Sequence, residues 1–295
     1  MVSIGVFDGV HRGHAAVFEK VRQRAAGMDG ESVIVTFDPH PRIVLGNDSG
    51  NLKYLTTFEE KKHLISQHNI DHLVVISFTR EFARQDPCNF VKEYLVGNTG
   101  MRHLVFGFDH HFGHKRQGNY DNLKECAALY GFTLEQLEPV FDGSNKISSS
   151  LIRSALSEGD VELAARLLSY PYSITGKITG GRQVGRIIGY PTANIIPDDQ
   201  HKLIPADGVY AVRVLLEDRI YSGMMNIGFR PTINREGAGR TLEVHIIDFD
   251  RDLYNKQIVI QFIGRIRAEQ KFNSLDRLKE QLSKDRSRII RILNS

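Results

Sequence analysis

The hydrophobic pattern of the chain changes character near Pro171. Before this point, short apolar runs at 2–7, 33–37, 73–76, 104–106 and 133–137 alternate with segments of helical periodicity. Such alternation predicts a mostly parallel, doubly wound α/β sheet with helices on both faces. After this point, short β segments punctuated by glycines occupy 173–179, 208–216, 220–227, 242–247 and 258–262. Closely spaced strands of this kind predict a small antiparallel barrel.

The length agrees with two domains, because 295 residues at roughly 150 per domain make two. We place them at residues 1–172 and 173–295. Thr57 and Glu60 form a capping box that would open one helix of the first domain, and Gly131 would end another over 119–130. The chain would finish in a helix with Ser274 as its N-cap. One apolar face of that helix would be made by Leu275, Leu278 and Leu282.

Composition excludes several classes of protein. Hydrophobic residues make up 41% of the chain, enough for a core, and the net charge of +3 is too small to predict a nucleic-acid partner. No apolar run approaches the roughly 20 residues of a membrane span. The two cysteines, Cys88 and Cys126, lie far apart in the sequence, which excludes a disulfide scaffold and a cysteine-rich zinc site. Few cysteines and no secretory N-terminus indicate the reducing cytoplasm.

The segment 5–14, Gly-Val-Phe-Asp-Gly-Val-His-Arg-Gly-His, leaves a strand, passes two glycines and enters a helix. Backbone N–H groups at a helix N-terminus suit an anion, and the imidazoles of His11 and His14 can add donors. The alternative is an ordinary strand–turn–helix junction with surface histidines. A zinc site that also uses His110, His111 and His114 is a further alternative, although no carboxylate–histidine helix motif accompanies either group.

Other polar segments follow other strands of the predicted sheet. Residues 37–41 follow the second strand, 107–109 the fourth, and 147–153 come after the fifth. In an open α/β sheet, ligands bind outside the carboxyl ends of the strands, so these segments should meet at one edge. The run Ser148, Ser149, Ser150 should begin a helix, and Arg153 would offer a charged fork one turn later. An ordinary helix start explains the serine run equally well.

The second domain carries its own polar pattern. Glycines in the segment 176–182 and at Gly189 would let the backbone approach a phosphate chain. Thr192 and Asn194 alternate with Ala193, so on an extended segment they point the same way and offer oxygen ligands suited to magnesium. The alternative is a barrel loop with a rigid proline turn.

Two further features of this domain have alternative interpretations. Glu243 and His245 share one face of a predicted strand, which is commonly just a solvent-facing side. The segment 264–291 holds nine basic and four acidic residues. This charge could attract RNA, but the segment has no regular interleaving of aromatic residues that would support base stacking. We interpret the segment as a solvated helix face.

Together, these motifs resemble a known family. The 5–14 segment and the element 147–153 resemble the nucleotidyltransferase superfamily, which has a Rossmann-like fold. The segments 37–41 and 107–118 narrow the resemblance to the adenylyltransferase module of bacterial bifunctional riboflavin kinase/FAD synthetase. From about Tyr172, the chain resembles the riboflavin kinase module, through Gly-Tyr-Pro-Thr-Ala-Asn at 189–194, Glu243-x-His245 and the segment 266–272.

The resemblance implies specific residue roles. The ATP site of the adenylyltransferase would comprise Gly5, Phe7, Asp8, Gly9, His11, Gly13, His14, Ser148, Ser149, Ser150 and Arg153, with His14 and Arg153 catalytic. Its FMN side would comprise Phe37, His40, Pro41 and Asp109. The kinase would bind ATP through Gly176, Lys177, Gly181, Gly189, Thr192 and Asn194, the last two also serving Mg²⁺. Glu243 would be the general base, and Arg267, Glu269 and Phe272 would lie beside the flavin.

The implied protein is a cytoplasmic, flavin-forming transferase with two ATP-dependent activities. The second domain would phosphorylate riboflavin to FMN, and the first would adenylylate FMN to FAD with release of pyrophosphate. Two alternatives stay open: a kinase fused to a nucleotidyltransferase for another acceptor, and a non-catalytic flavin or nucleotide sensor. The expected partners are riboflavin, FMN and ATP, with no nucleic acid, no membrane and no obligate protein partner.

Overall fold

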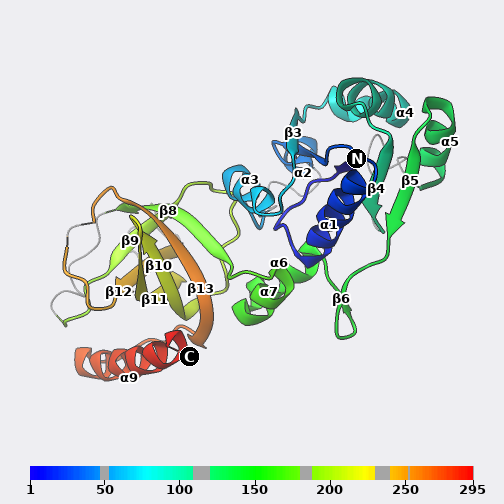
Figure 1. Ribbon diagram of the computed structural model, residues 1–295. Coiled ribbons are helices and arrows are strands. Elements are labelled where there is room, and N and C mark those ends of the chain that lie inside the picture. Colours follow the sequence, from blue (N-terminus) through cyan, green and yellow to red (C-terminus); the bar gives the residue numbers. More distant parts are fainter. Residues whose placement is uncertain (47–52, 109–119, 180–187, 230–239, 252, 295) are drawn as a thin grey trace. The chain divides into compact units, whose positions relative to one another are not determined.

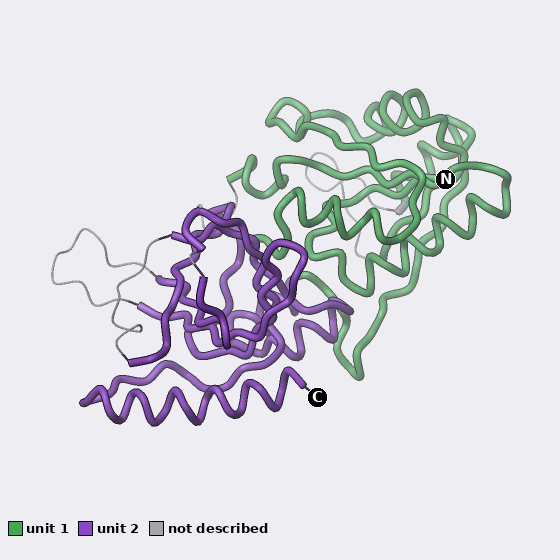
Figure 2. The backbone as a smooth tube through the Cα atoms, turned by 60° about the vertical axis from the view of Figure 1, so that its left-hand side comes forward, with its two compact units in different colours: residues 1–149 green, residues 150–295 purple. Residues whose placement is uncertain are grey.

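The computed structural model describes the chain except for residues 47–52, 109–119, 180–187, 230–239, 252 and 295. It divides into two compact units, residues 1–149 and 150–295 (Figure 2). Each unit is described by itself below.

The first unit is built on a five-stranded parallel sheet with the order β3-β2-β1-β4-β5 (Figure 1). The strands are β1 (Val2–Ile4), β2 (Val33–Asp38), β3 (His72–Ser77), β4 (His103–Gly107) and β5 (Thr133–Leu137). All five match predicted apolar runs, so the predicted parallel α/β sheet is confirmed. β1 ends at Ile4, earlier than predicted, and the chain then turns at Phe7, whose φ is 51°.

Helices cover both faces of this sheet. Strand alternation turns Ile34 and Val105 toward one face, where they pack against α1 (Arg12–Gly27) and α3 (Phe58–Ser66). Val35 and Phe106 point to the other face, against α4 (Pro87–Phe90), the π-helical segment η2 (Val91–Gly97) and α5 (Tyr120–Tyr130). Two short elements, α2 (Pro41–Leu45) and the 3₁₀ turn η1 (Phe82–Arg84), complete the connections. The unit is therefore three-layered, as doubly wound folds are.

The predicted helix signals act as expected. The capping box is complete: Glu60 N donates to Thr57 Oγ1, and Thr57 N donates to Glu60 Oε2. Gly131, with φ of 70°, follows the last residue of α5 in the left-handed conformation that glycine tolerates. Sequence analysis missed the small hairpin of β6 (Phe141–Asp142) and β7 (Asn145–Lys146), because two-residue strands leave no periodicity.

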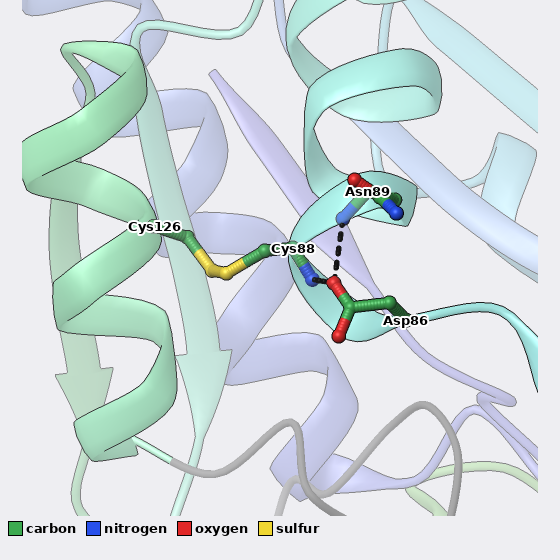
Figure 3. The surroundings of a disulfide bond; sticks show 4 residues. All are labelled: Asp86, Cys88, Asn89 and Cys126. Carbon is green, nitrogen blue, oxygen red and sulfur yellow. Dashed lines mark hydrogen bonds between the residues drawn. A yellow bond between two sulfur atoms is a disulfide. The ribbon is translucent and has the colours of Figure 1, made fainter.

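The two cysteines form a bond that sequence analysis had not predicted. Cys88 on α4 and Cys126 on α5 form a disulfide, with their Cα atoms 5.6 Å apart (Figure 3). Asp86 fixes the start of α4, since its Oδ1 accepts hydrogen bonds from Cys88 N at 2.9 Å and Asn89 N at 3.1 Å. A separation of 38 residues says nothing about distance once two helices pack on the same face of a sheet.

The second unit contains α6 (Ser149–Glu158, beginning at the unit boundary), α7 (Val161–Leu168) and a closed barrel. The barrel strands follow the order β10-β11-β12-β9-β8-β13. Their bounds are β8 (Ser173–Thr179), β9 (Ala193–Pro197), β10 (Gly208–Leu216), β11 (Arg219–Phe229), β12 (Arg240–Ile246) and β13 (Gln257–Arg267). The predicted barrel is confirmed, although β9 had not been predicted as one of its strands.

The terminal helix α9 (Leu275–Leu293) packs on the barrel through its second half. Ile289 is fully buried in a cluster with Val209 and Ile266, and Leu282 lies against the same cluster. Ser274 caps the helix as predicted, accepting a hydrogen bond from Arg277 N. Leu275 had been placed on the apolar face, but it is 57% exposed.

Candidate active sites

The loop between β1 and α1 lies where the strand order of the first sheet reverses. β1 is the central strand and pairs with β2 on one side and with β4 on the other. The strand order therefore runs outward from β1 in both directions. In open α/β sheets, ligands bind at this switch point, outside the carboxyl ends of the strands. The segment 5–14 therefore occupies the position at which a nucleotide site is expected.

The backbone of this loop is held in uncommon conformations. Phe7, Gly9 and Val10 all have positive φ, at 51°, 82° and 37°. Positive φ at a β-branched residue such as Val10 is an outlier, and it persists only where surrounding contacts over-determine it. Val10 is almost fully buried in the core beneath the loop. A Cβ at Gly5 would lie 2.9 Å from the ring of Phe7, so this glycine lets the ring fold back over the strand end.

The two motif histidines form one stacked unit at the start of α1. The rings of His11 and His14 lie 3.6 Å apart between centroids with an interplanar angle of 18°. His11 is the N-cap residue, and its Nδ1 accepts a hydrogen bond from His14 N at 3.4 Å. A Cβ at Gly13 would come within 3.1 Å of the His11 ring, which explains the glycine between the histidines. The structure thus brings both imidazoles to the positive end of the helix dipole.

Asp8 serves the loop rather than facing solvent. Its buried carboxylate accepts hydrogen bonds from Leu55 N at 2.9 Å and Thr56 N at 3.1 Å. Gly9 N donates to Thr56 Oγ1 at 3.1 Å. Ser149 reaches the same loop, since its Oγ donates to the backbone oxygen of Asp8 at 2.9 Å. Residues 55 and 56 had not been predicted, because nothing in the local pattern ties them to the motif.

The serine run does begin a helix, as predicted, with Ser149 as the first residue of α6. Ser148 precedes this helix in the first unit, whereas Ser150 and Arg153 fall in the second unit. The participation of Ser150 and Arg153 in the phosphate site stays a prediction.

On the predicted flavin side, Phe37 is a core residue. Its ring packs 5.5 Å from that of Phe78 and 5.9 Å from that of Phe82. His40 caps the following helix α2, with its Nδ1 accepting from Arg42 N, and Pro41 is the first helical residue. Asp109 lies outside the described residues. Its neighbour Phe108 is 52% exposed at the end of β4, with the Lys146 ammonium 5.1 Å from its ring centroid.

In the barrel, one row of polar residues crosses four neighbouring strands. Asn194 on β9 lies directly opposite Thr179 on β8 and Glu243 on β12, and Glu243 lies opposite Asn226 on β11. Residues directly opposite one another in antiparallel strands project from the same face. All four are half-buried, whereas Leu242, Val244 and Ile195 beside them are buried. Asn226 escaped sequence analysis, because only the strand register places it beside Glu243.

Thr192 joins this row just before β9. Its Oγ1 lies 3.5 Å from Glu243 Oε2, at the long limit of a hydrogen bond. The structure therefore brings Thr192, Asn194 and Glu243 together from two strands, as the motif analysis expected. These oxygen atoms are of the kind that Mg²⁺ prefers.

His245 contacts the backbone of the loop before β9. It is buried, and its Nδ1 lies 2.8 Å from the backbone oxygen of Pro191. Since a carbonyl only accepts, Nδ1 carries a proton. The ring also packs edge-on against Tyr190 at 5.3 Å. Loss of hydration on burial lowers the pKa of His245, partly opposed by the hydrogen bond to Pro191. A neutral imidazole thus holds the Tyr-Pro-Thr turn.

A cleft of about 1270 Å³ opens beside this turn. Its lining includes Tyr190, Thr192 and His245, together with Lys279 and Arg286 of α9. Its charged lining is mixed: Arg251, Lys279 and Arg286 lie among Asp248 and Asp250, and Arg286 pairs with Asp248 at 2.8 Å. Gly189, with φ of 82°, lies in the cleft wall at a position where only glycine is relaxed.

The other predicted kinase residues have diverse surroundings. Gly176 is buried where a Cβ would meet Ile196 O at 2.5 Å, so strand pairing alone requires this glycine. Lys177 is exposed, and Gly181 lies outside the described residues. The Arg267 guanidinium is held by Asp285 of α9 at 2.8 Å and lies 5.7 Å from the ring centroid of Phe272. The Glu269 carboxylate packs directly on Gly228.

The described part of the chain holds no group of three His, Cys, Asp or Glu side chains able to bind a metal ion. His110, His111 and His114 lie outside that part. No helix among the described residues is long and apolar enough to cross a membrane.

Comparisons with known proteins match the two parts of the chain to two different families. The family model for FAD synthetase matches residues 1–151, and the model for riboflavin kinase matches residues 168–293. The chain is 38% identical to the bifunctional riboflavin kinase/FMN adenylyltransferase of Listeria monocytogenes, over 97% of this chain and 90% of that protein. The Bacillus subtilis protein of the same description is 36% identical, over 100% and 93%. A solved structure described as a macrolide-efflux protein from Streptococcus pneumoniae matches with a TM-score of 0.88 at 32% identity, over 97% and 92%.

A Rossmann-like sheet with the loop 5–14 at its switch point, followed by a closed barrel with a polar row and matched by these two family models, defines a two-module transferase of phosphorus-containing groups. The chain belongs to the bifunctional riboflavin kinase/FMN adenylyltransferase family. Its C-terminal module phosphorylates riboflavin to FMN, and its N-terminal module adenylylates FMN to FAD. The predicted function is confirmed, which decides against the two alternatives kept open above.

Proposed function

We propose that the loop 5–14 and Ser149 bind the ATP phosphates during FMN adenylylation, and that the segment 37–41 lies on the FMN side. The FMN phosphate attacks the α-phosphorus of ATP, a new P–O bond forms, and the bond to pyrophosphate breaks. Both reactants are polyanions, so the protein's task is to align them and offset charge. The stacked pair His11–His14 at the N-terminus of α1 is the observation that carries this assignment.

For riboflavin phosphorylation, we propose Glu243 as the general base and Thr192 with Asn194 as the ATP–magnesium side. Glu243 would accept the proton of the riboflavin 5′-hydroxyl as its oxygen attacks the γ-phosphorus and ADP leaves. The juxtaposition of Glu243 with Thr192 and Asn194 supports this assignment. Arg267, held by Asp285, and Glu269 would border the flavin.

The oxygen donors beside Glu243 fit a magnesium ion. Mg²⁺ usually binds one or two protein oxygens, substrate phosphates and water rather than a complete protein cage. The hydroxyl of Thr192 and the amide oxygen of Asn194 would supply such ligands. When bound, the ion would neutralise phosphate charge.

We further propose that the kinase module extends over residues 173–295 and the adenylyltransferase over 1–172. We infer a cytoplasmic setting, because both reactions consume ATP. Riboflavin, FMN and ATP suffice as partners for both activities.

A product profile tests the residue assignment. With riboflavin, ATP and Mg²⁺, the unaltered enzyme should form FMN and then FAD. His14→Ala should stop at FMN, with FAD formation reduced on the order of 100- to 1,000-fold, the usual cost of losing one donor to transition-state charge. Glu243→Gln should form FMN far more slowly but should convert supplied FMN to FAD at the normal rate. Equal loss of both activities in a folded His14→Ala variant would contradict the assignment of this loop.

A further inference from the structure

Helix α3 carries two adjacent lysines with opposite environments. Lys62 is exposed and pairs with Glu59 at 2.6 Å, an ordinary surface contact. Lys61 is only 6% exposed, and its Nζ lies within the first unit. Lysine is rarely buried unless its ammonium group is satisfied by partners. The buried lysine therefore needs an explanation that its neighbour does not.

The Lys61 ammonium bridges the ends of two adjacent strands. It donates to Val6 O at 3.3 Å, to Thr36 Oγ1 at 3.1 Å and to Phe37 O at 3.1 Å. Val6 follows β1, whereas Thr36 and Phe37 end β2. The parallel register of β1 with β2 runs only to Ile4 and Val35. Lys61 thus joins the two segments just beyond the point where β1 and β2 stop pairing, while β2 stays paired with β3 as far as Asp38.

The segments that continue from these strand ends are the two halves of the proposed adenylyltransferase site. Val6 leads directly into the loop with His11 and His14, and Phe37 leads into the segment with His40. A second link ties α3 to the first of them, because Asp8 accepts from the backbone of Leu55 and Thr56 immediately before the helix. Helix α3 is therefore fastened to the ATP-side loop at its start and to both strand ends one turn later.

Burial of this ammonium carries an energetic cost. Loss of hydration lowers the pKa of Lys61 from 10.5 to about 8, and the charges of Asp8 and Asp38 offset only part of this effect. An apolar residue would avoid the cost, but it would leave the oxygen of Phe37 without this donor. The bridge between strand ends, rather than packing alone, gives the lysine its role.

We propose that Lys61 is a positioning residue for FMN adenylylation, holding the ATP-side loop and the flavin-side segment at the separation required for reaction. This inference rests on the proposed roles of these two segments. In-line attack requires the reacting atoms to lie about 3–3.5 Å apart, and a misplacement of about 1 Å costs on the order of 100-fold in rate. Lys61 is buried and acts through its hydrogen bonds to Val6, Thr36 and Phe37.

The expected kinetic effect differs from that of a general loss of stability. Each substrate would still bind its own segment, so the KM values for ATP and FMN should change little. The kcat should fall, because relative placement matters most in the transition state. Partial unfolding would instead lower the amount of active enzyme and the thermal midpoint together.

The test compares Lys61→Met with Lys62→Met in the full-length enzyme. Lys61→Met should lower kcat for FAD formation from FMN on the order of 10- to 100-fold. Lys62→Met should match the unaltered enzyme, and both variants should phosphorylate riboflavin normally. A folded Lys61→Met variant with the kcat of Lys62→Met would overturn the proposal.

A second variant covers failure of Lys61→Met to fold. Thr36→Val keeps the volume of the fully buried Thr36 side chain but removes one acceptor of the Lys61 ammonium, together with the hydrogen bond that Thr36 Oγ1 donates to Val6 O at 3.3 Å. It should lower kcat for FAD formation by several-fold at unchanged KM, and an unchanged kcat in folded Thr36→Val would overturn the proposal. His14→Ala, measured in parallel, separates the two hypotheses: normal FAD formation in that variant contradicts the site assignment, not the role of Lys61.

Discussion

Asn194 on β9 lies directly opposite Glu243 on β12, so the proposed magnesium ligand and the proposed base project from one face of the barrel. Neither residue reaches this position through sequence proximity, since 49 positions separate them. The pairing of two strands makes the site, and the hydroxyl of Thr192 completes it from the turn before β9. Substitutions in this row should therefore affect one activity of the enzyme and leave the other intact.

The first prediction concerns Asn194→Ala. Loss of the amide oxygen should weaken riboflavin phosphorylation and raise the magnesium concentration needed for half-maximal rate, because the ion would lose one of its few protein ligands. Adenylylation of supplied FMN should keep its magnesium dependence. The measurement is a magnesium titration of both activities. Asn226→Ala, in the same row on β11, is the matched control, and an unchanged magnesium requirement in Asn194→Ala would return the segment 189–194 to a structural loop.

The second prediction concerns the size of the effect of Glu243→Gln. The amide keeps the shape of the side chain but cannot accept a proton at neutral pH. Kinase turnover should fall roughly 100- to 10,000-fold, the usual contribution of general base catalysis. Riboflavin affinity should change little, because the lost interaction belongs mainly to the transition state.

Glu217→Gln serves as the control for this variant, since Glu217 is an exposed carboxylate of the same barrel, paired with Lys256. It should retain full kinase turnover. A Glu243→Gln enzyme with more than about a tenth of normal turnover would reduce Glu243 to a positioning role.

The third prediction concerns the pH dependence of stability. Burial lowers the pKa of His245 below 6.5, so below pH 6.5 the unfolded chain binds a proton that the folded chain does not. The free energy of unfolding should therefore fall as pH decreases from 6.5 toward the folded-state pKa, by at most about 1.4 kcal/mol per pH unit. Above pH 6.5, this residue should contribute no pH dependence.

Denaturant unfolding at a series of pH values, compared with His245→Gln, measures this contribution. Glutamine can still donate to Pro191 O but does not titrate. The difference between the two proteins should shrink as pH falls. A difference that stays constant across this range would show that the imidazole is not kept neutral by the fold.

The fourth prediction concerns the disulfide between α4 and α5. Closing a loop with a sequence separation of 38 residues should stabilise the first unit by about 3–4 kcal/mol, through restriction of the unfolded chain. Dithiothreitol should lower the unfolding midpoint of that unit, whereas riboflavin phosphorylation should be unaffected. The variant Cys88→Ser should behave like the reduced enzyme and should be insensitive to dithiothreitol. Equal stability with and without reductant would contradict the prediction.

These residues also show what the sequence could and could not predict. Strand alternation and caps are local, so the sheet, the barrel and the helix starts at Thr57 and Ser274 were all predictable. Motif residues such as His11, Thr192 and Glu243 were identified because their motifs resemble those of a known family. Lys61 stands in a run of charged residues that predicts an exposed helix face. Only its spacing of four from the buried Ile65 indicates that it faces inward. Asn226, Asp285 and the Cys88–Cys126 pair depend on long-range register or packing, which local pattern does not contain.

The last prediction concerns the smallest stable kinase fragment. The structural boundary falls after Ser149, whereas the proposed module begins at residue 173. The intervening helix α7 packs on β13: Val161, Leu167 and Leu168 are fully buried, and Glu162 Oε1 accepts from Arg265 N at 3.0 Å. Because each fully buried aliphatic side chain contributes about 1.5–3 kcal/mol, a fragment without this helix should be several kcal/mol less stable than one with it.

Fragments 150–295 and 173–295 should therefore differ in stability but agree in chemistry. Both fragments contain the polar row of Thr179, Asn194, Glu243 and Asn226. Both should therefore convert riboflavin to FMN, and neither should form FAD from added FMN and ATP. Denaturant unfolding should give a lower midpoint for 173–295. Equal midpoints would show that α7 is dispensable to the barrel. A folded fragment 150–295 that fails to phosphorylate riboflavin would mean that the kinase site needs residues of the first unit, which would contradict the two-module assignment.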